Sequence, residues 1–345
     1  MGALALQLRG IMGAIREGRL PARALAIADS RALVRTMFLA SAVQVEVLPY
    51  LRDSRRLTEI VHYTGCTRPD RLRAWLGIGT ELGELDVIGE RYRVRGRRSR
   101  ALAGGDQLLV AHYRSMLEYQ VGPYGSLEEF LKGDSGMGRS DLSRFAGDIA
   151  QVSRAAEPFV ASFVRQAVAT VRPANVLDVG CGSAVYSRVV LDTDAQARVE
   201  GIDLAADVIA AARLELDQAG YGSRVTLHVG DAQRWSGASP TQFDLIMLVN
   251  NIYYFDPVTR CALYRDLGSH LTEGGQLLIV SMLFPGSIAS AHLHFMLTCQ
   301  SVTSSLPAPG EIENDLRQSG FQILAKQTLV PTEPFIGVRA RKIQE

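Results

Sequence analysis

Lysine is almost absent from this chain of 345 residues, and cysteine and aromatic side chains are scarce. Three of the 37 basic residues are lysines and the rest are arginines, a bias that we attribute first to a GC-rich coding sequence. The four cysteines show no CxxC or other metal-ligand spacing, which fits free thiols in a reducing cytoplasm. No uninterrupted run of about 20 apolar residues is present, so we expect no membrane-spanning helix. Arg9 and Arg16 interrupt the first 20 residues, so we expect no secretory leader and a cytosolic protein.

The net charge is only +1, from 37 basic and 36 acidic side chains. This balance argues against a dedicated nucleic-acid binder, because affinity for phosphate depends on an excess of positive charge. The first 150 residues carry 22 basic and 17 acidic side chains, and the remainder carry 15 and 19. The length fits about two domains, and the charges indicate that the two halves differ.

The first half of the chain has helical periodicity and one hairpin pattern. The predicted order is helix, helix, turn, helix and hairpin, over residues 36–51, 57–64, 65–68, 69–82 and 85–94. This is the order of a winged-helix domain. The helical pattern resumes over residues 106–172, with expected breaks near 122–126 and 133–138.

The second half alternates short β-branched runs with helical segments, which predicts an α/β fold with a doubly wound, Rossmann-like parallel sheet. Such a sheet binds its ligand at the carboxyl ends of the strands. The expected strands are residues 175–179, 198–203, 224–229, 243–249 and 276–281, with helices at 205–219 and 257–271. Residues 321–328 and 335–342 are expected to add a terminal hairpin.

The most specific segment is the strand–turn–helix pattern of residues 176–186, VLDVGCGSAVY. Gly180 and Gly182 allow the backbone to approach a ligand closely. A dinucleotide is disfavoured, because Val185 replaces the third glycine of its motif and the Asp178 carboxylate would lie near the phosphates. An acid beside the turn suits a cationic ligand, such as the ammonium group of an amino acid.

Acidic residues also end the next two strands, at Asp203 and at Asp231. The Asp203 carboxylate can accept both hydroxyls of a ribose, and Asp231 can accept from an adenine amino group. Together with Asp178 they match ammonium, ribose and adenine in order. Asn250, at the end of the fourth strand, is placed to hold the methionine part of the same cofactor.

These segments resemble the class I S-adenosylmethionine-dependent methyltransferases over most of residues 170–282. The first half resembles the winged-helix dimerisation domain that precedes many small-molecule O- and C-methyltransferases of secondary metabolism. The resemblance implies a homodimer, with an N-terminal helical domain over 1–104, a helical connection lining the acceptor pocket over 105–172, and a cofactor-binding domain over 173–345. It implies S-adenosyl-L-methionine as cofactor, bound by Asp178, Gly180, Gly182, Asp203, Leu204, Asp231 and Ala232. Ala184 replaces the third motif glycine, a departure that the fold should tolerate.

Methyl transfer is an in-line displacement, so the protein mainly aligns donor and acceptor and excludes water. Plant-type O-methyltransferases add a histidine base after the fourth strand, and the best alignment places Tyr253 there. A tyrosine is a poor base at neutral pH but a good hydrogen-bond partner. Tyr253 and Tyr254 are both candidates for the acceptor site; we expect only one to face the acceptor and favour Tyr254.

Residues 274–310 contain no Asp, Glu, Lys or Arg, and this stretch follows the fifth strand, where the fold often inserts its substrate cover. Its composition predicts a pocket-lining segment and a small, largely apolar acceptor. His292 and His294 within it are candidate bases. On an extended segment they would share one side, whereas a helix would separate them.

Two alternatives remain open. One is a 2-oxo-acid C-methyltransferase, in which His292, His294 and Asp256 would hold a metal that fixes an enolate, although that ligand set is incomplete and no metal is expected. The other is a DNA-binding regulator that senses S-adenosylmethionine. The run of six arginines over residues 91–100, at the expected wing, motivates it. Because the winged-helix region is only mildly basic, we expect no nucleic-acid partner.

Overall fold

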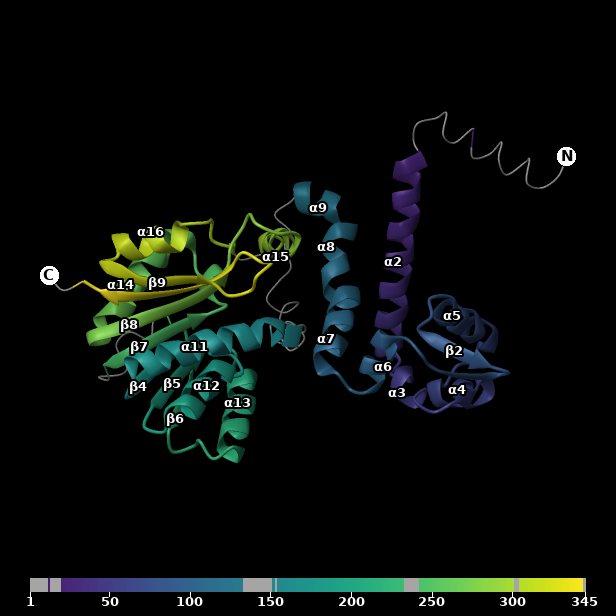
Figure 1. Cartoon of the computed structure of the whole chain (residues 1–345), viewed down its shortest axis with the longest axis horizontal. Coiled ribbons are helices and arrows are strands. Elements are labelled where there is room, and N and C mark those ends of the chain that lie inside the picture. Colours follow the sequence, from purple (N-terminus) through teal and green to yellow (C-terminus); the bar gives the residue numbers. More distant parts are fainter. Residues whose placement is uncertain are drawn as a thin grey trace. The chain divides into compact units, whose positions relative to one another are not determined.

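The computed structural model describes residue 12 and residues 20–132, 151–152, 154–232, 242–300 and 304–343. The chain divides into two compact units, Met1–Gly122 and Pro123–Glu345 (Figure 1). The three-part division expected from the sequence remains a prediction. No helix among the described residues is long and apolar enough to cross a membrane.

The first unit has the predicted winged-helix order. Its strands form one small antiparallel sheet in the order β1-β3-β2, and a cluster of buried apolar side chains that includes Leu39, Ile60 and Leu76 joins its helices. Its elements are α2 (Leu20–Gln44), α3 (Val47–Tyr50), β1 (Arg55–Arg56), α4 (Leu57–Thr64), α5 (Pro69–Glu81), β2 (Leu85–Ile88), β3 (Arg91–Val94), α6 (Arg97–Ala103), α7 (Gln107–Ser115) and the π-helix η1 (Met116–Gln120).

Three expectations for the first half are wrong in detail. The helix expected over 36–51 is two helices, because Glu46 adopts a left-handed conformation (φ 53°) between α2 and α3. The arginine run is not a single wing, since Arg97 begins α6, which packs through the buried Ser99 and Leu102. The break expected at 122–126 is mostly helical, as α8 (Val121–Gly125) continues from η1. The break expected at 133–138 lies outside the described residues.

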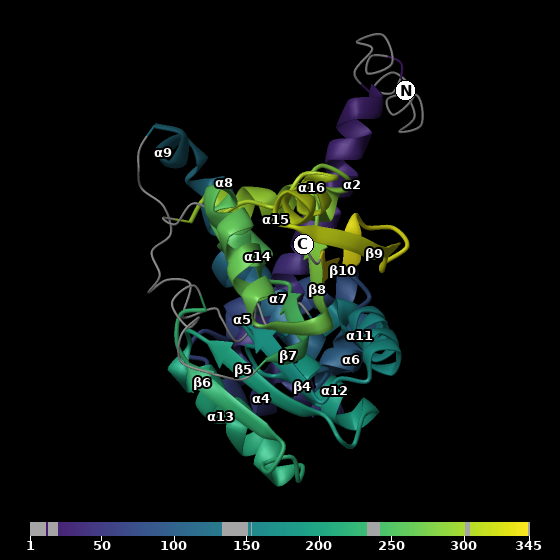
Figure 2. The ribbon, with the colours of Figure 1, turned by 90° about the vertical axis from the view of Figure 1, so that its left-hand side faces the viewer.

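The second unit is built on a seven-stranded sheet in the order β6-β5-β4-β7-β8-β10-β9, which can be followed in Figure 2. The neighbours from β6 to β8 are parallel, and β10 pairs antiparallel with both β8 and β9. The predicted doubly wound class is confirmed. The strands are β4 (Asn175–Val179), β5 (Arg198–Asp203), β6 (Val225–Val229), β7 (Phe243–Val249), β8 (Leu271–Met282), β9 (Phe321–Thr328) and β10 (Phe335–Lys342).

Helices cover both faces of this sheet. The apolar side chains of β4 alternate between two core clusters, with Val176 in one and Leu177 and Val179 in the other. Figure 1 shows α11 and α12 on the face opposite α14 and α16. The helices of this unit are α9 (Leu127–Lys132), η2 (Arg154–Ala156), α11 (Glu157–Val171), α12 (Val185–Thr193), α13 (Ala206–Gln218), η3 (Ile252–Tyr254), η4 (Pro257–Thr259), α14 (Arg260–Ser269), α15 (Ile288–Thr298) and α16 (Glu311–Gln318).

Candidate cofactor and acceptor site

The glycine turn after β4 has the open geometry that a bound ligand needs. Gly180 (φ 64°) and Gly182 (φ 51°) both adopt the left-handed conformation that favours glycine, and a Cβ at Gly182 would meet nothing within 4 Å. The Gly180 N–H donates to the Ile202 carbonyl (2.7 Å), which ties the turn to β5. Ala184 keeps the left-handed backbone (φ 56°) at the position where the resembling family has its third glycine.

Asp178 lies beneath this turn rather than at its surface. Asp178 is only 2% exposed, and its Oδ2 accepts a hydrogen bond from the Ser187 hydroxyl (2.6 Å). Burial raises the pKa of Asp178 to about 7, against the smaller opposite effect of the Ser187 hydrogen bond. We therefore expect the Asp178 carboxylate to attract a cation at the turn by its charge, and not to form a direct hydrogen bond with it.

Asp203 ends β5 and holds the turn in place. Its Oδ2 accepts from the Gly182 N–H and its Oδ1 from the Ala205 N–H, both at 2.9 Å. Each carboxylate oxygen has a second lone pair, so the same atoms can also accept ribose hydroxyls. Leu204 follows with 66% exposure, an apolar side chain available to cover a flat ring.

Asp231 and Ala232 follow the end of β6, on the strand neighbouring β5. Ala232 is partly buried against the core face that contains Leu177 and Leu248. The expected acids thus follow or end three adjacent parallel strands, and the register pairs Asp203 with Val229. The carboxyl ends of these strands form one edge, where the sequence predicted the cofactor.

The end of β7 supplies two neighbouring amides, of which the sequence indicated only Asn250. Asn251 is buried (8% exposed) and its Nδ2 donates to the carbonyl of Val179, in the last position of β4. A Cβ at Gly180 would overlap that same Nδ2 atom. Asn251 therefore braces the glycine turn. Its only sequence signal was its place next to Asn250.

Tyr253 and Tyr254 differ in exposure, as expected of neighbours on a short 3-10 helix. Tyr253 is 9% exposed and packs with Leu297 and Leu306, and burial raises its pKa well above the usual value. Tyr254 is 48% exposed. A buried phenol with a raised pKa cannot serve as a base at neutral pH, so Tyr253 does not replace the family's histidine in that role.

Within the charge-free stretch, Ile288–Thr298 form the helix α15, which is one of the two conformations considered from the sequence. His292 and His294 therefore do not share one side. His292 contacts Tyr124, whose hydroxyl lies 2.7 Å from its Nδ1, and the two rings are stacked (interplanar angle 12°). His294 stacks on Phe284, with 4.3 Å between ring centroids. Burial lowers the pKa of both imidazoles, which favours their neutral forms.

The structure does not bring together the three residues considered as metal ligands, His292, His294 and Asp256. Because α15 directs the two imidazoles to different neighbours, they do not form an HxH pair. Among the described residues, no three His, Cys, Asp or Glu side chains are grouped so that they could hold a metal ion. The Asp256 carboxylate accepts from the Val258 N–H and caps η4.

Three of the six arginines that motivated the regulator hypothesis are engaged in ion pairs within the first unit. Arg91 lies 3.6 Å from Glu59, Arg93 lies 3.1 Å from Asp86, and Arg98 lies 3.7 Å from Glu84. These carboxylates reduce the positive field that a nucleic-acid partner would meet.

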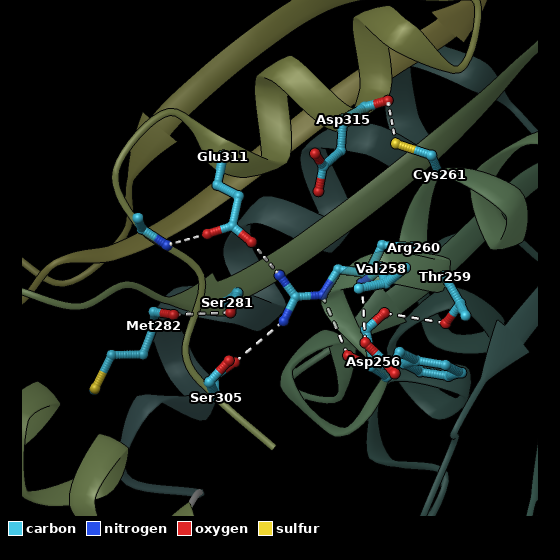
Figure 3. Close-up of polar contacts among 12 residues, drawn as sticks. Asp256, Val258, Thr259, Arg260, Cys261, Ser281, Met282, Ser305, Glu311 and Asp315 are labelled. Atoms are coloured by element: carbon cyan, nitrogen blue, oxygen red, sulfur yellow. Dashed lines mark hydrogen bonds and ion pairs between the residues drawn. The ribbon is translucent and has the colours of Figure 1, made fainter. Parts of the chain in front are cut away.

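A buried arginine fastens the loop that carries the two tyrosines. Arg260 is fully buried, and its guanidinium donates to the Phe255 carbonyl (3.3 Å). It also donates to Glu311 (2.6 Å) and to the Ser305 carbonyl (3.2 Å), as Figure 3 shows. The Ser305 N–H in turn donates to the Tyr253 carbonyl. The segment that follows the charge-free helix is therefore joined to the end of β7. No sequence pattern indicated this residue.

Comparison with known proteins agrees with this geometry. Residues 176–275 match the sequence model of a methyltransferase domain family. A tRNA1(Val) (adenine(37)-N6)-methyltransferase of Salmonella arizonae is 31% identical over 89 residues, which are 26% of this chain and 36% of that protein. The chain thus spans about a third of the length of the curated relatives it matches.

Two solved structures are similar in fold over nearly the whole chain. An O-methyltransferase family protein from Burkholderia thailandensis has a TM-score of 0.76 at 18% identity, covering 94% of this chain and 98% of that one. Human N-acetylserotonin methyltransferase, solved in complex with S-adenosylmethionine, has a TM-score of 0.73 at 14% identity, covering 94% and 98%.

The fold and the site define a class I methyltransferase domain with an N-terminal winged-helix unit. Residues 176–275 thus form a methyltransferase domain, and the chain as a whole shares its fold with S-adenosylmethionine-dependent methyltransferases, as its sequence motifs predicted.

Proposed function

We propose that this protein transfers a methyl group from S-adenosylmethionine to a small, largely apolar metabolite of the secondary-metabolism type. The observation that carries the proposal is the pairing of the strand-end acids and glycine turn with a cover helix, α15, that has no charged side chain. When bound, the cofactor supplies an electrophilic methyl group on a positively charged sulfur. The chain must then align the acceptor and exclude water.

The cofactor would be held by residues of the three strand ends. Asp203 suits the ribose, because its carboxylate is fixed by two backbone N–H groups and keeps free lone pairs. Leu204 and Ala232 supply apolar contact for the adenine, and Asp231 an acceptor for its amino group. Gly180 and Gly182 leave room for the methionine part.

We assign the acceptor side to Tyr254 and to the α15 histidines, with His292 as the general base. The stacked Tyr124 fixes one ring nitrogen of His292 at 2.7 Å. If Nδ1–H donates to the Tyr124 oxygen, Nε2 is the atom that takes the acceptor's proton, and Tyr124 stabilises the resulting imidazolium. His294, stacked on Phe284, is the second candidate. Tyr253 supports the loop from within the core.

This assignment is tested by release of S-adenosylhomocysteine with a fixed panel of phenols, aromatic amines and N-heterocycles. We expect turnover with at least one apolar acceptor, a fall in kcat of about 10²-fold or more for His292→Asn, and a smaller fall for Tyr124→Phe. If His294→Asn lowered kcat more than His292→Asn, His294 would be assigned as the base instead. Turnover only with strongly charged acceptors would overturn the proposed substrate class.

The pH dependence gives a second readout for His292. Burial lowers the pKa of this imidazole, so the proton-accepting form persists below the ordinary histidine value of about 6.5. At saturating S-adenosylmethionine, we expect kcat/KM for the acceptor to fall only at pH values below that, and Tyr124→Phe to move the midpoint. An acid limb unaffected by both His292→Asn and Tyr124→Phe would exclude the histidine as base.

We also propose a cytosolic homodimer. All four cysteines are free thiols, as suits a reducing compartment. Helix α2 exposes large apolar side chains along its length, which favours a second copy of the chain as their cover. They are Leu25, Ile27, Leu33, Val34 and Met37.

A further inference from the structure

Two neighbouring amide oxygens at the carboxyl end of β7 are buried without a hydrogen-bond donor. They are Oδ1 of Asn250 and Oδ1 of Asn251, and neither has a partner among the described residues. Asn251 as a whole is 8% exposed. Buried polar atoms are nearly always paired, so two adjacent exceptions beside a ligand turn indicate a donor that arrives with the ligand.

The position of Asn251 is fixed by its other amide atom. Its Nδ2 donates to the Val179 carbonyl and lies against the α-carbon of Gly180. Because the amide is planar, Oδ1 is directed away from that bond and cannot be satisfied by the same carbonyl. Asn250 is held in a left-handed conformation (φ 57°), and its N–H donates to the Val280 carbonyl (2.9 Å). The sheet therefore fixes the side-chain amide of Asn251 and the backbone of Asn250 before any ligand binds.

Asp178, the acid of the glycine motif, is poorly placed for direct contact. It is 2% exposed and already accepts from Ser187. Its charge still acts across the turn, because electrostatic interaction is strong in a buried environment. A positive ligand group beside the turn thus meets amide oxygens first and the carboxylate behind them.

We propose that the Oδ1 atoms of Asn250 and Asn251 accept hydrogen bonds from the ammonium group at the methionine end of the cofactor, with Asp178 as a charge behind them. An ammonium group carries three N–H donors, so it can satisfy both unpaired oxygens and keep one donor for another acceptor. The same oxygens repel a carboxylate, so they also orient the amino-acid end, with the ammonium toward the protein. The inference rests on the proposed binding of S-adenosylmethionine.

The test is isothermal titration calorimetry with two ligands that share the adenosine part. S-adenosylhomocysteine carries the ammonium group, and 5′-methylthioadenosine lacks the amino-acid end. Asn250→Gly removes one oxygen while glycine keeps the left-handed backbone, and Asn251→Ala removes the other. Asn175→Ala, at the opposite end of β4, is the matched control.

We expect Asn250→Gly to weaken S-adenosylhomocysteine binding about tenfold and to leave 5′-methylthioadenosine binding within about twofold. Asn251→Ala also removes the brace of the turn, so it should weaken the binding of both ligands, with an additional loss of about tenfold for S-adenosylhomocysteine. Asn175→Ala should leave both affinities unchanged. If the Asn variants lost affinity for the two ligands equally, Asn251 would only support the turn, and the inference would be overturned. Unchanged affinity for S-adenosylhomocysteine in both variants would overturn it as well. Absence of binding by the wild-type chain would instead contradict the proposed function.

Discussion

Gly180 and Gly182 have similar backbone conformations but different surroundings. Comparing them separates the cost of a left-handed conformation from the cost of a Cβ that overlaps a neighbouring atom. Alanine at either position costs about 1–2 kcal/mol because of the left-handed conformation. At Gly180 the new Cβ also overlaps the Asn251 amide, whereas at Gly182 it meets open space. We expect Gly180→Ala to lower the melting temperature clearly more than Gly182→Ala, measured by differential scanning calorimetry. Equal losses would mean that Asn251 does not brace the turn.

The buried Asp178 predicts pH-dependent cofactor binding. Since burial raises its pKa to about 7, the carboxyl is neutral below that pH and its attraction for the cofactor's positive charge is lost. We expect the affinity for S-adenosylhomocysteine to fall as the pH decreases from 8 to 6, by titration calorimetry. Asp178→Asn should abolish most of this dependence, and Asp217→Asn, at the end of α13, should retain it.

The same group affects stability with the opposite sign. Its folded pKa lies above the unfolded value of about 3.9, so the ligand-free folded state binds the proton more tightly and loses stability as the pH rises from about 4 to about 7. We expect Asp178→Asn to raise the ligand-free melting temperature at pH 8 while weakening cofactor binding. A lower melting temperature at pH 8 would show that the carboxylate is stabilised by contacts other than the ligand.

Single residues were predictable where the chemistry is local. Asp178, Asp203 and the two glycines are adjacent to strand ends that the periodicity located. Asn251 could not be recognised, because its role depends on a contact with Val179, 72 positions away. Arg260 looked like one arginine among many, and only the tertiary packing buries it.

At the level of elements, Arg260 joins three segments: the end of η3, the stretch at Ser305 and the start of α16. Losing one member of a buried ion pair costs about 3–5 kcal/mol, because the remaining charge is left uncompensated. We expect Arg260→Met to destabilise the fold by somewhat less, about 2–4 kcal/mol in urea unfolding, since the Glu311 side chain is 32% exposed and can hydrate.

The exposed pair of Lys132 and Glu128 on α9 provides the control for that prediction. Both side chains are largely exposed, so Glu128→Gln should change the free energy of unfolding by less than about 1 kcal/mol. If Arg260→Met changed the free energy of unfolding by a similarly small amount, the hydrogen bonds of Arg260 would not hold the loop that carries Tyr253 and Tyr254.

The strands were the most predictable elements, because runs such as 175–179 and 243–249 are buried on both faces and bounded by turn residues. The sequence left helix α15 undecided between a helix and an extended segment, because an apolar stretch without charges shows no amphipathic period. Its start is set by a reciprocal cap between Ser287 and Ser290. The arginine run was assigned to the wing because the boundary at Gly96 carries no strong helix signal.

For the whole molecule, the exposed apolar face of α2 carries the homodimer prediction. Burying a large apolar side chain is worth about 1.5–3 kcal/mol, so introducing charge there should separate the copies. We expect the double variant Leu33→Glu, Met37→Glu to elute as a monomer in size-exclusion chromatography with light scattering, and the wild type as a dimer. Ile88→Glu, an exposed position of the hairpin, should leave the dimer intact. A monomeric wild type would exclude the homodimer.

Binding of S-adenosylmethionine at the carboxyl edge of the seven-stranded sheet underlies every role proposed for the residues of the site. Titration calorimetry of the wild type and of Asp203→Ala tests it directly, because Asp203 both fixes the glycine turn and faces the predicted ribose position. We predict one site per chain with a dissociation constant between about 1 μM and 1 mM, weakened at least about tenfold in the variant. No saturable binding by the folded wild type, or equal affinity in Asp203→Ala, would contradict the account.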